Sequence, residues 1–123
     1  MKYLFTKNCR EFRKRVSEIV KKQFPHNEKY LLLSQLLDSS RSVTANIAEG
    51  FGRFHYQENI QFCRQARGSL TESMEHLIVG YDERYLDKAS LKELNKLYRL
   101  CLLELNIYIK YLKSAKSMTT ENK

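Results

Sequence analysis

The side chains that most often carry enzymatic chemistry are sparse in this chain and do not converge on one site. The three histidines, His26, His55 and His76, are far apart, and none has a second histidine at helical spacing. Glu72, Glu75 and His76 form the one tight acid–histidine cluster, which we interpret as solvated polar side chains because it offers a poor ligand set for a metal. No nucleophile–base pair or pair of carboxylates can be assembled from the pattern. We therefore expect a protein that is not an enzyme and needs no cofactor or metal.

The cysteines do not suggest redox or metal chemistry either. Cys9, Cys63 and Cys101 lack the spacing of a metal or redox motif, and each lies on an apolar helical stripe, so we interpret them as small buried hydrophobic residues of a reducing compartment. The N-terminal residues carry no signal-peptide apolar run. The longest apolar stretch, Leu100 to Leu112, includes Glu104 and is too short to span a membrane. We expect a cytoplasmic protein without a membrane partner.

Positive charge is the strongest compositional signal. Lys and Arg outnumber Asp and Glu by 22 to 14, which gives a net charge of +8 and suggests a polyanionic partner, with nucleic acid as the first candidate. The alternative is an ordinary basic protein whose charges are merely solvated. The candidate phosphate-binding residues lie on two basic helical faces and in one connection: Arg10, Lys14, Lys21, Arg53, Lys92, Lys96, Arg99, Lys110 and Lys113.

These side chains must be positioned by helices, because four segments have helical periodicity and none alternates as a strand. The predicted helices span residues 8–24, 27–49, 56–81 and 90–115. Asn8 with Glu11, and Ser90 with Glu93, have the spacing of capping boxes. We expect an all-α fold, an antiparallel up-down four-helix bundle, as a single domain over residues 1–116. Residues 117–123 are predicted to be a disordered tail.

Glycines and apolar stripes predict how the helices pack. Gly50 and Gly52 are expected to end the second helix with positive φ angles, and Gly68 to permit close helix packing. The core face of the third helix is predicted to run from Cys63 to Tyr81. That of the fourth follows a heptad pattern, with its apolar residues at Leu91, Leu94, Tyr98, Cys101, Leu105, Tyr108 and Leu112.

The fourth helix has more apolar surface than one bundle seam requires. Its second stripe consists of Leu97, Leu100, Leu103, Ile107 and Tyr111. A helix that is apolar on two faces must bury both, so we expect a homo-oligomer that uses this stripe as its interface. Two alternatives remain open. The fourth helix could lie centrally in its own bundle, or the stripe could bind another protein together with the acidic segment 68–87, which would make the chain an interaction scaffold.

One segment resembles a known family. Residues 42–53, SVTANIAEGFGR, are similar to the ANIAEGxGR signature of the 23S ribosomal RNA intervening-sequence four-helix-bundle proteins. Glu58, Phe62 and the run ARGSLTE at residues 66–72 resemble the second signature of that family, and the similarity extends over nearly the whole chain. His55 departs from the pattern, because a serine is expected there and histidine caps a helix poorly.

The resemblance implies a four-helix bundle assembled as a ring, a pentamer. It also implies relatedness to the accessory variability proteins of diversity-generating retroelements, which are basic barrels that bind nucleic acid beside a reverse transcriptase. A reverse transcriptase or another protein is therefore a candidate partner. The family name describes where its genes occur, within insertions of large ribosomal RNA, and does not make this a ribosomal protein.

The two signatures also predict a polar layer between the second and third helices. It would consist of Asn46, Glu49, Arg67, Ser69 and Glu72. Glu49 could pair with Arg67 or with Arg53 in a charge-assisted contact that fixes helix register. Alternatively, the arginines and Asn46 could contact a phosphate or a base.

Overall fold

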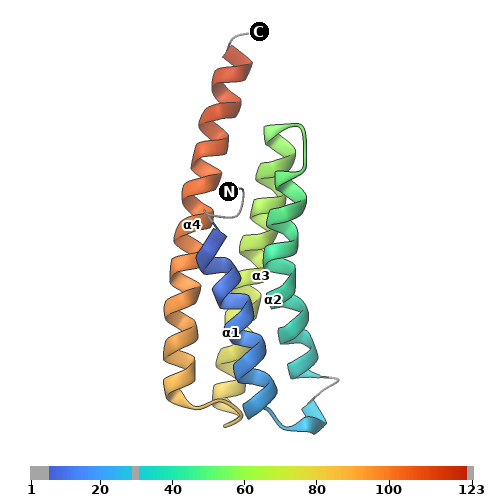
Figure 1. Cartoon of the computed structure of the whole chain (residues 1–123), viewed down its shortest axis with the longest axis vertical. Coiled ribbons are helices and arrows are strands. Elements are labelled where there is room, and N and C mark those ends of the chain that lie inside the picture. The colour runs from blue at the N-terminus through green and yellow to red at the C-terminus, as the bar shows by residue number, and fades with distance from the viewer. Residues whose placement is uncertain (1–5, 29–30, 122–123) are drawn as a thin grey trace.

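Four α-helices run up and down beside one another, and each packs against its neighbours in the chain, with α1 returning to α4 (Figure 1). The computed structural model describes residues 6–28 and 31–121. Its elements are α1 (Lys7–Gln23), the short 3-10 helix η2 (His26–Glu28), α2 (Leu32–Phe51), α3 (Tyr56–Asp82) and α4 (Lys88–Glu121). The predicted all-α, antiparallel up-down four-helix bundle is confirmed.

Two helix limits differ from those predicted. The second helix begins at Leu32 rather than at Asn27, because the residues after Pro25 form η2 instead. The fourth helix continues to Glu121 rather than ending near Ala115, so the described part of the expected disordered tail is helical. No glycine or proline interrupts this stretch, and the backbone ladder therefore continues without a break. The rest of that tail lies outside the described residues.

The α4 helix begins two residues before the expected capping box. Asp87 is its cap: the Ser90 backbone N–H donates to Asp87 Oδ1 at 2.7 Å, and this bond holds the pKa of the Asp87 carboxyl below its usual range. Glu93, expected to close a box with Ser90, instead forms a two-bond ion pair with the Arg15 guanidinium of α1. Gln23, the last residue of α1, also holds this end, because its side chain accepts from the Asp87 N–H and donates to Ser90 Oγ.

The N-terminus of α1 is capped from another helix. Asn8 does not serve as the cap, because the helix already starts at Lys7, and the N-cap residue Thr6 makes no side-chain capping bond. Instead, the Glu104 carboxylate of α4 accepts the backbone N–H of Asn8 at 3.1 Å and that of Cys9 at 3.3 Å. The Asn8 side-chain amide donates to the other oxygen at 3.1 Å. Glu104 thereby satisfies N–H groups that the first turn of any helix leaves unpaired.

A disulfide joins α1 to α4 at the same level. Cys9 and Cys101 are bonded, with their Cα atoms 4.5 Å apart, and both are fully buried. The prediction that all three cysteines are buried is confirmed, but the prediction that none is paired is wrong for these two. The two cysteines are 92 residues apart in the sequence, and only the antiparallel packing of α1 on α4 brings their sulfurs together. The pairing could therefore not be predicted from cysteine spacing. Cys63 remains a free, buried thiol.

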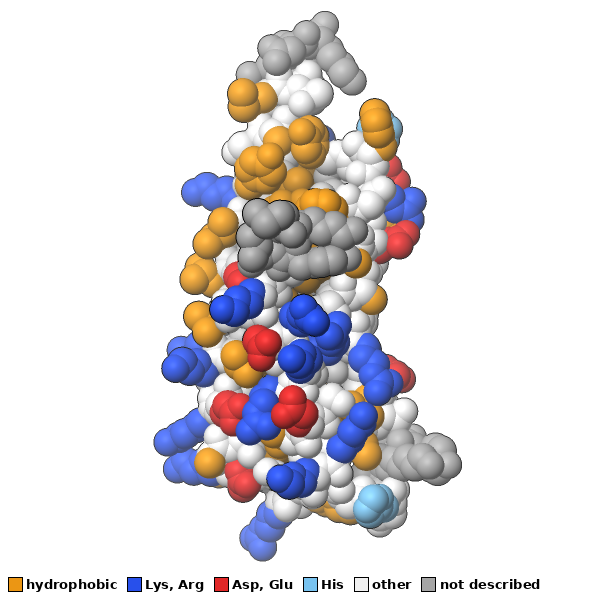
Figure 2. All heavy atoms as spheres, viewed as in Figure 1, with side chains coloured by type: hydrophobic (Ala, Val, Ile, Leu, Met, Phe, Trp, Pro, Cys, Tyr) orange, Lys and Arg blue, Asp and Glu red, His pale blue; other side chains and the backbone are white. Residues whose placement is uncertain are grey.

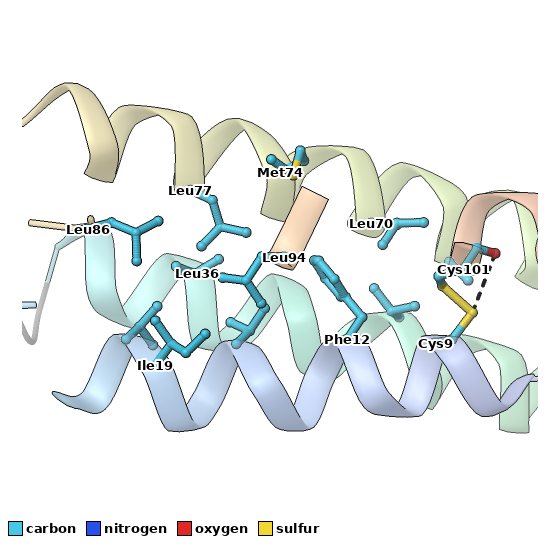
Figure 3. Close-up of a cluster of buried hydrophobic side chains, with 14 of the residues drawn as sticks. Cys9, Phe12, Ile19, Leu36, Leu70, Met74, Leu77, Leu86, Leu94 and Cys101 are labelled. Carbon is cyan, nitrogen blue, oxygen red and sulfur yellow. Dashed lines mark hydrogen bonds between the residues drawn. A yellow bond between two sulfur atoms is a disulfide. The ribbon is translucent and has the colours of Figure 1, made fainter. Parts of the chain in front are cut away.

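The core is one apolar column shared by all four helices. Figure 3 shows Phe12 and Ile19 of α1 meeting Leu36 of α2, Leu77 of α3 and Leu94 of α4. The predicted heptad face of α4 lies in this interior, either fully buried or half-buried. The predicted core face of α3 fails at its last residue, because Tyr81 is 37% exposed. The buried residue there is the neighbouring Gly80, and the absence of a side chain on it leaves room for the ring of Phe24.

Glycine has a different role from the one predicted. No described glycine has a positive φ, and Gly50 lies within α2 rather than after it. A Cβ at Gly50 would lie 2.8 Å from both Asn59 Oδ1 and Phe62 Cβ of α3, so this glycine permits the close approach of the two helices. Gly68, by contrast, has no atom within 4 Å of a built Cβ, and the predicted close packing there is wrong.

The α1 and α4 helices differ greatly in length. The α1 helix has 17 residues and α4 has 34, which correspond to about 26 Å and about 51 Å at 1.5 Å per residue. Their paired ends lie at Gln23 and Asp87, and α1 begins beside Glu104. The C-terminal half of α4 therefore extends past the start of α1 (Figure 1).

The Glu104 cap gives a pH-dependent prediction. Partial burial raises the pKa of the Glu104 carboxyl, although the Asn8 and Cys9 N–H bonds oppose the shift. A raised pKa means that the folded protein holds the proton more tightly than the unfolded chain. Stability from this group is therefore complete below the ordinary Glu pKa, about 4.3, and is lost as pH rises through the folded value. We expect the unfolding free energy of the wild type, relative to Glu104→Gln, to fall over that window in urea titrations. Parallel pH profiles for the two proteins would contradict the assignment.

The two helical glycines give a matched pair of variants. Gly50→Ala should lower the free energy of unfolding by about 1–3 kcal/mol, because the new methyl group overpacks the α2–α3 contact. Gly68→Ala should raise it by up to about 1 kcal/mol, because the site is open and alanine has the higher helix propensity. Thermal or urea unfolding measures both. Equal effects of the two substitutions would show that Gly50 does not mark a close helix contact.

Candidate nucleic-acid interface

The predicted basic residues of α1 lie at the surface and remain largely unpaired. Arg10, Lys14 and Lys21 are exposed. Lys14 has one carboxylate, that of Glu11, at 3.9 Å, whereas Arg10 and Lys21 form no ion pair with a described residue. Figure 2 shows Lys and Arg side chains gathered over α1 and its flanks, in the lower and middle parts of that view. This face can present several cations to a polyanion at once.

The predicted basic face of α4 has the same character. All five of its members are exposed, and none forms an ion pair with a described residue: Lys92, Lys96, Arg99, Lys110 and Lys113. Lys92, Lys96 and Arg99 lie within two turns of helix, beginning at the level of the Arg15–Glu93 ion pair that joins α1 to α4. Because no carboxylate competes for these cations, each of them can neutralise a phosphate.

Arg53 differs from the other candidates, because two carboxylates neutralise it. It follows α2, where its guanidinium bonds Glu49 Oε1 at 2.7 Å and lies 3.7 Å from Glu58 Oε2. The same group lies over the Phe62 ring, 4.9 Å from its centre. Of the two partners considered for Glu49, the structure selects Arg53 rather than Arg67. These contacts fasten the α2–α3 connection and leave Arg53 a poorer phosphate ligand than the unpaired arginines.

A groove between α1 and α2 contains two arginines that the sequence did not single out. It has a volume of about 650 Å³, and Arg10, Arg13 and Arg41 line it together with Thr44. The Arg13 guanidinium donates to Thr44 Oγ1 at 2.9 Å. Arg13 is one turn from Arg10, a spacing that could have drawn attention to it. Arg41 is distant in sequence, and only the packing of α2 against α1 brings it to the same groove.

Hydroxyl groups form a polar ladder between α2 and α3, and two members of the predicted polar layer, Asn46 and Ser69, belong to it. Ser69 Oγ donates to Ser42 Oγ at 3.0 Å, and Ser39 Oγ lies 2.8 Å from Ser73 Oγ. Asn46 joins the ladder within α2, where its amide donates to Ser42 Oγ at 2.8 Å. Asn46 and Ser69 are therefore brought together through a serine that sequence reasoning had not included. The short serine side chains let the two helices approach closely.

The other members of that layer lie elsewhere. Arg67 donates to Asn106 Oδ1 of α4 at 2.8 Å and so links α3 to α4 rather than to α2. Glu72 is exposed and lies 3.4 Å from the His76 imidazole one turn along α3. With Glu49 paired to Arg53, the expected five-residue network is divided among four separate places.

The second apolar stripe of α4 is largely exposed in this single chain. Leu103, Ile107 and Tyr111 are 56–60% exposed, and Leu100 is 36% exposed. Leu97 differs, because it is half-buried and packs against the core. The four exposed residues share a face about 80° wide at ~100° per residue, and Met118, 65% exposed, extends it. Figure 2 shows apolar side chains over the upper part of α4, above the level at which α1 begins.

Reactive groups are few in the described part of the chain. Burial raises the pKa of the Cys63 thiol to about 11, so little thiolate is present near neutral pH. Within residues 6–28 and 31–121, no three His, Cys, Asp or Glu side chains are placed to hold a metal ion. Among the same residues, no helix has the length and apolarity required to cross a membrane.

Comparison with known proteins bears on the motif at residues 42–53. A search of curated protein sequences finds no match to the chain. The family model described as "23S rRNA-intervening sequence protein" matches residues 1–107. That span covers α1, α2, α3 and most of α4, including the SVTANIAEGFGR and ARGSLTE segments. The chain therefore belongs to the 23S rRNA-intervening sequence protein family.

Proposed function

We propose that this protein is a non-catalytic, homo-oligomeric bundle that binds RNA or DNA with little sequence preference. The observation that carries the proposal is the set of unpaired cations on α1, α2 and α4. At least seven exposed Lys and Arg side chains on these helices have no carboxylate of a described residue in ion-pair distance: Arg10, Lys21, Arg41, Lys92, Lys96, Arg99 and Lys110. Contacts from such groups go to phosphates, which carry no sequence information.

Assembly through the apolar stripe of α4 is the second part of the proposal. A monomer would leave Leu103, Ile107, Tyr111 and Met118 in water, and a contiguous apolar patch of this kind favours association. The occupant we propose is a second copy of the chain, because the stripe lies on a long, regular helix whose basic face adjoins it. In a closed ring, every copy would add +8 to a shared field. The pentamer implied by the family resemblance fits such a ring.

A protein-interaction scaffold is the alternative function. It is favoured by the second half of α3, where Ile78 and Tyr81 are 40% and 37% exposed among the carboxylates of segment 68–87. A partner such as a reverse transcriptase would then bind this acidic hairpin or the α4 stripe. Salt distinguishes the two functions, because contacts to phosphates weaken steeply with salt and apolar protein contacts persist.

A cytoplasmic location stays a prediction. The Cys9–Cys101 disulfide removes the argument from unpaired cysteines, since disulfides are uncommon in reducing compartments. Alkylation of thiols in fresh cell extract, followed by mass analysis, reports whether the pair is oxidised in the cell.

The nucleic-acid proposal predicts tight, salt-sensitive binding. The purified protein is titrated with labelled single-stranded RNA, duplex DNA and an RNA–DNA hybrid over a range of salt concentrations. We expect log K to fall linearly with log salt, with a slope near −0.7 for each phosphate contact on a single strand and about −0.9 on duplex DNA. Failure to bind any of the three at low salt would overturn the proposal and favour the scaffold.

Charge reversal then locates the footprint. Lys92→Glu, Lys96→Glu and Arg99→Glu together should weaken binding at least tenfold and leave assembly intact. A control reverses Arg64 and Arg84, two exposed cations of α3 and of the α3–α4 connection without an ion pair to a described residue. Equal affinity of the first triple variant and the wild type would show that the basic face of α4 is not part of the footprint.

The assembly proposal predicts dissociation when the stripe is charged. Leu103→Glu with Ile107→Glu should give a helical monomer, because burying two carboxylates at an apolar interface is unfavourable. Native mass measurement and circular dichroism report the result. The control, Asn106→Glu with Ser117→Glu, adds the same charge on another exposed face and should keep the native mass. A double Leu103/Ile107 variant that retains the wild-type mass rules out the stripe as the interface.

A further inference from the structure

We infer that the groove between α1 and α2 is a nucleotide site, in which Arg10, Arg13 and Arg41 hold the phosphate backbone of a single-stranded nucleic acid. The inference rests on the proposed nucleic-acid function and specifies where, and in which form, the strand binds. It adds two residues, Arg13 and Arg41, that neither family signature contains and that lie on different helices.

The charge within the groove is unopposed. The guanidinium groups of Arg10, Arg13 and Arg41 line one hollow of about 650 Å³, and no carboxylate of a described residue lies within ion-pair distance of any of them. A smaller adjoining hollow of about 240 Å³ is lined by Arg13 and Arg41 again, and by Lys14. Its one carboxylate, Glu18, is already bonded to Arg15 at 3.1 Å. Four cations therefore follow the α1–α2 junction, and the two acids beside them are Glu18, which is bonded to Arg15, and Glu11, which lies 3.9 Å from Lys14.

The geometry of Arg13 distinguishes this groove from an ordinary solvated face. Arg13 is only half-exposed, and one of its terminal nitrogens is held by Thr44 Oγ1 at 2.9 Å. The remaining N–H groups of a planar guanidinium form a fixed fork that matches two phosphate oxygens. Because Thr44 already restricts the side chain, less conformational entropy is lost on binding than for a free surface arginine.

The walls of the groove select the kind of ligand. Beside the arginines lie Ala45 and Ala48, which are exposed and half-exposed and offer an apolar surface to the face of a base. A base can lie on this wall only where its face is unstacked, as in a single strand, because in a duplex both faces of each base are covered by the neighbouring base pairs. The volume lies within the range of sites for small ligands, about 300–1,000 Å³. Phosphate on the arginines and base on the alanine wall is thus an arrangement that a single strand can adopt and a duplex cannot.

The test compares single-stranded and duplex binding in three variants. Arg13→Gln with Arg41→Gln should weaken binding of a labelled single-stranded oligonucleotide at least tenfold. It should also reduce the slope of log K against log salt by about 1.4, which is two contacts at about 0.7 each. Binding to duplex DNA should change less than threefold. The matched control, Arg64→Gln with Arg84→Gln, removes two exposed charges away from the groove and from the basic face of α4, and should behave as the wild type.

Two further variants keep the test decisive if the glutamine variant folds poorly. Arg13→Lys with Arg41→Lys keeps the charge and removes the planar fork, so we expect weaker binding with an unchanged salt slope. Thr44→Val keeps the shape and both arginines, and tests Thr44 as a positioning residue. It should weaken single-strand binding severalfold, also without a change in slope. Circular dichroism and thermal unfolding confirm that each variant is folded.

The outcomes separate this inference from the proposed function. If the wild type binds no nucleic acid at all, both are overturned. If the wild type binds but the arginine and threonine variants bind equally well, the groove is overturned while the function stands. Inorganic phosphate and a nucleoside monophosphate serve as competitors. Displacement of the strand by inorganic phosphate as readily as by the nucleotide would reduce the groove to a free-anion site and overturn the role of the apolar wall.

Discussion

The pairing of a short helix with a long one is the constraint on which the rest of this structure depends. Gln23 fixes the end of α1 at the start of α4, and Glu104 and the Cys9–Cys101 disulfide fix its beginning halfway along α4. Because both ends are fixed, α1 can cover only half of its partner. The bundle is consequently complete at one end, where four helices enclose the core, and of the helices in residues 6–28 and 31–121 only α2, α3 and α4 reach the other end.

This asymmetry separates the two surface properties of the protein. Cations lie along α1 and on the neighbouring faces of α2 and α4, where the bundle has four helices (Figure 2). Exposed apolar residues, Leu103 to Met118, lie on the part of α4 that α1 does not reach. Association through the apolar end would leave free the cations of α1 and the Lys92–Arg99 part of α4, whereas Lys110 and Lys113 lie beside the apolar stripe. The groove between α1 and α2 is at the basic end.

Sequence patterns predicted the helices and their inner faces because these depend on local periodicity. The heptad face of α4 and the apolar face of α1 that contains Cys9 could be recognised without knowing which helices pack against them. Contacts between distant residues could not be found in this way. The Cys9–Cys101 bond, the Glu104 cap and the meeting of Arg13 with Arg41 all arise from the antiparallel packing of helices. Gly50 was recognised, but its reason, the approach of Asn59 and Phe62, required the structure. The family motif correctly indicated a polar contact between α2 and α3. It did not predict that the Arg67 side chain would bond to Asn106 of α4.

The fastenings of α1 have a mechanical consequence. A covalent bond, a cap and a side-chain bridge join α1 to α4, while serine hydroxyls and a close glycine contact join α2 to α3. The α1–α2 contact is the least extensive of the four contacts between neighbouring helices, so sliding of packed helices would be least restricted there. The groove lies at this α1–α2 contact, so we expect the distance between α1 and α2 to adjust to a bound ligand more readily than any other spacing between neighbouring helices.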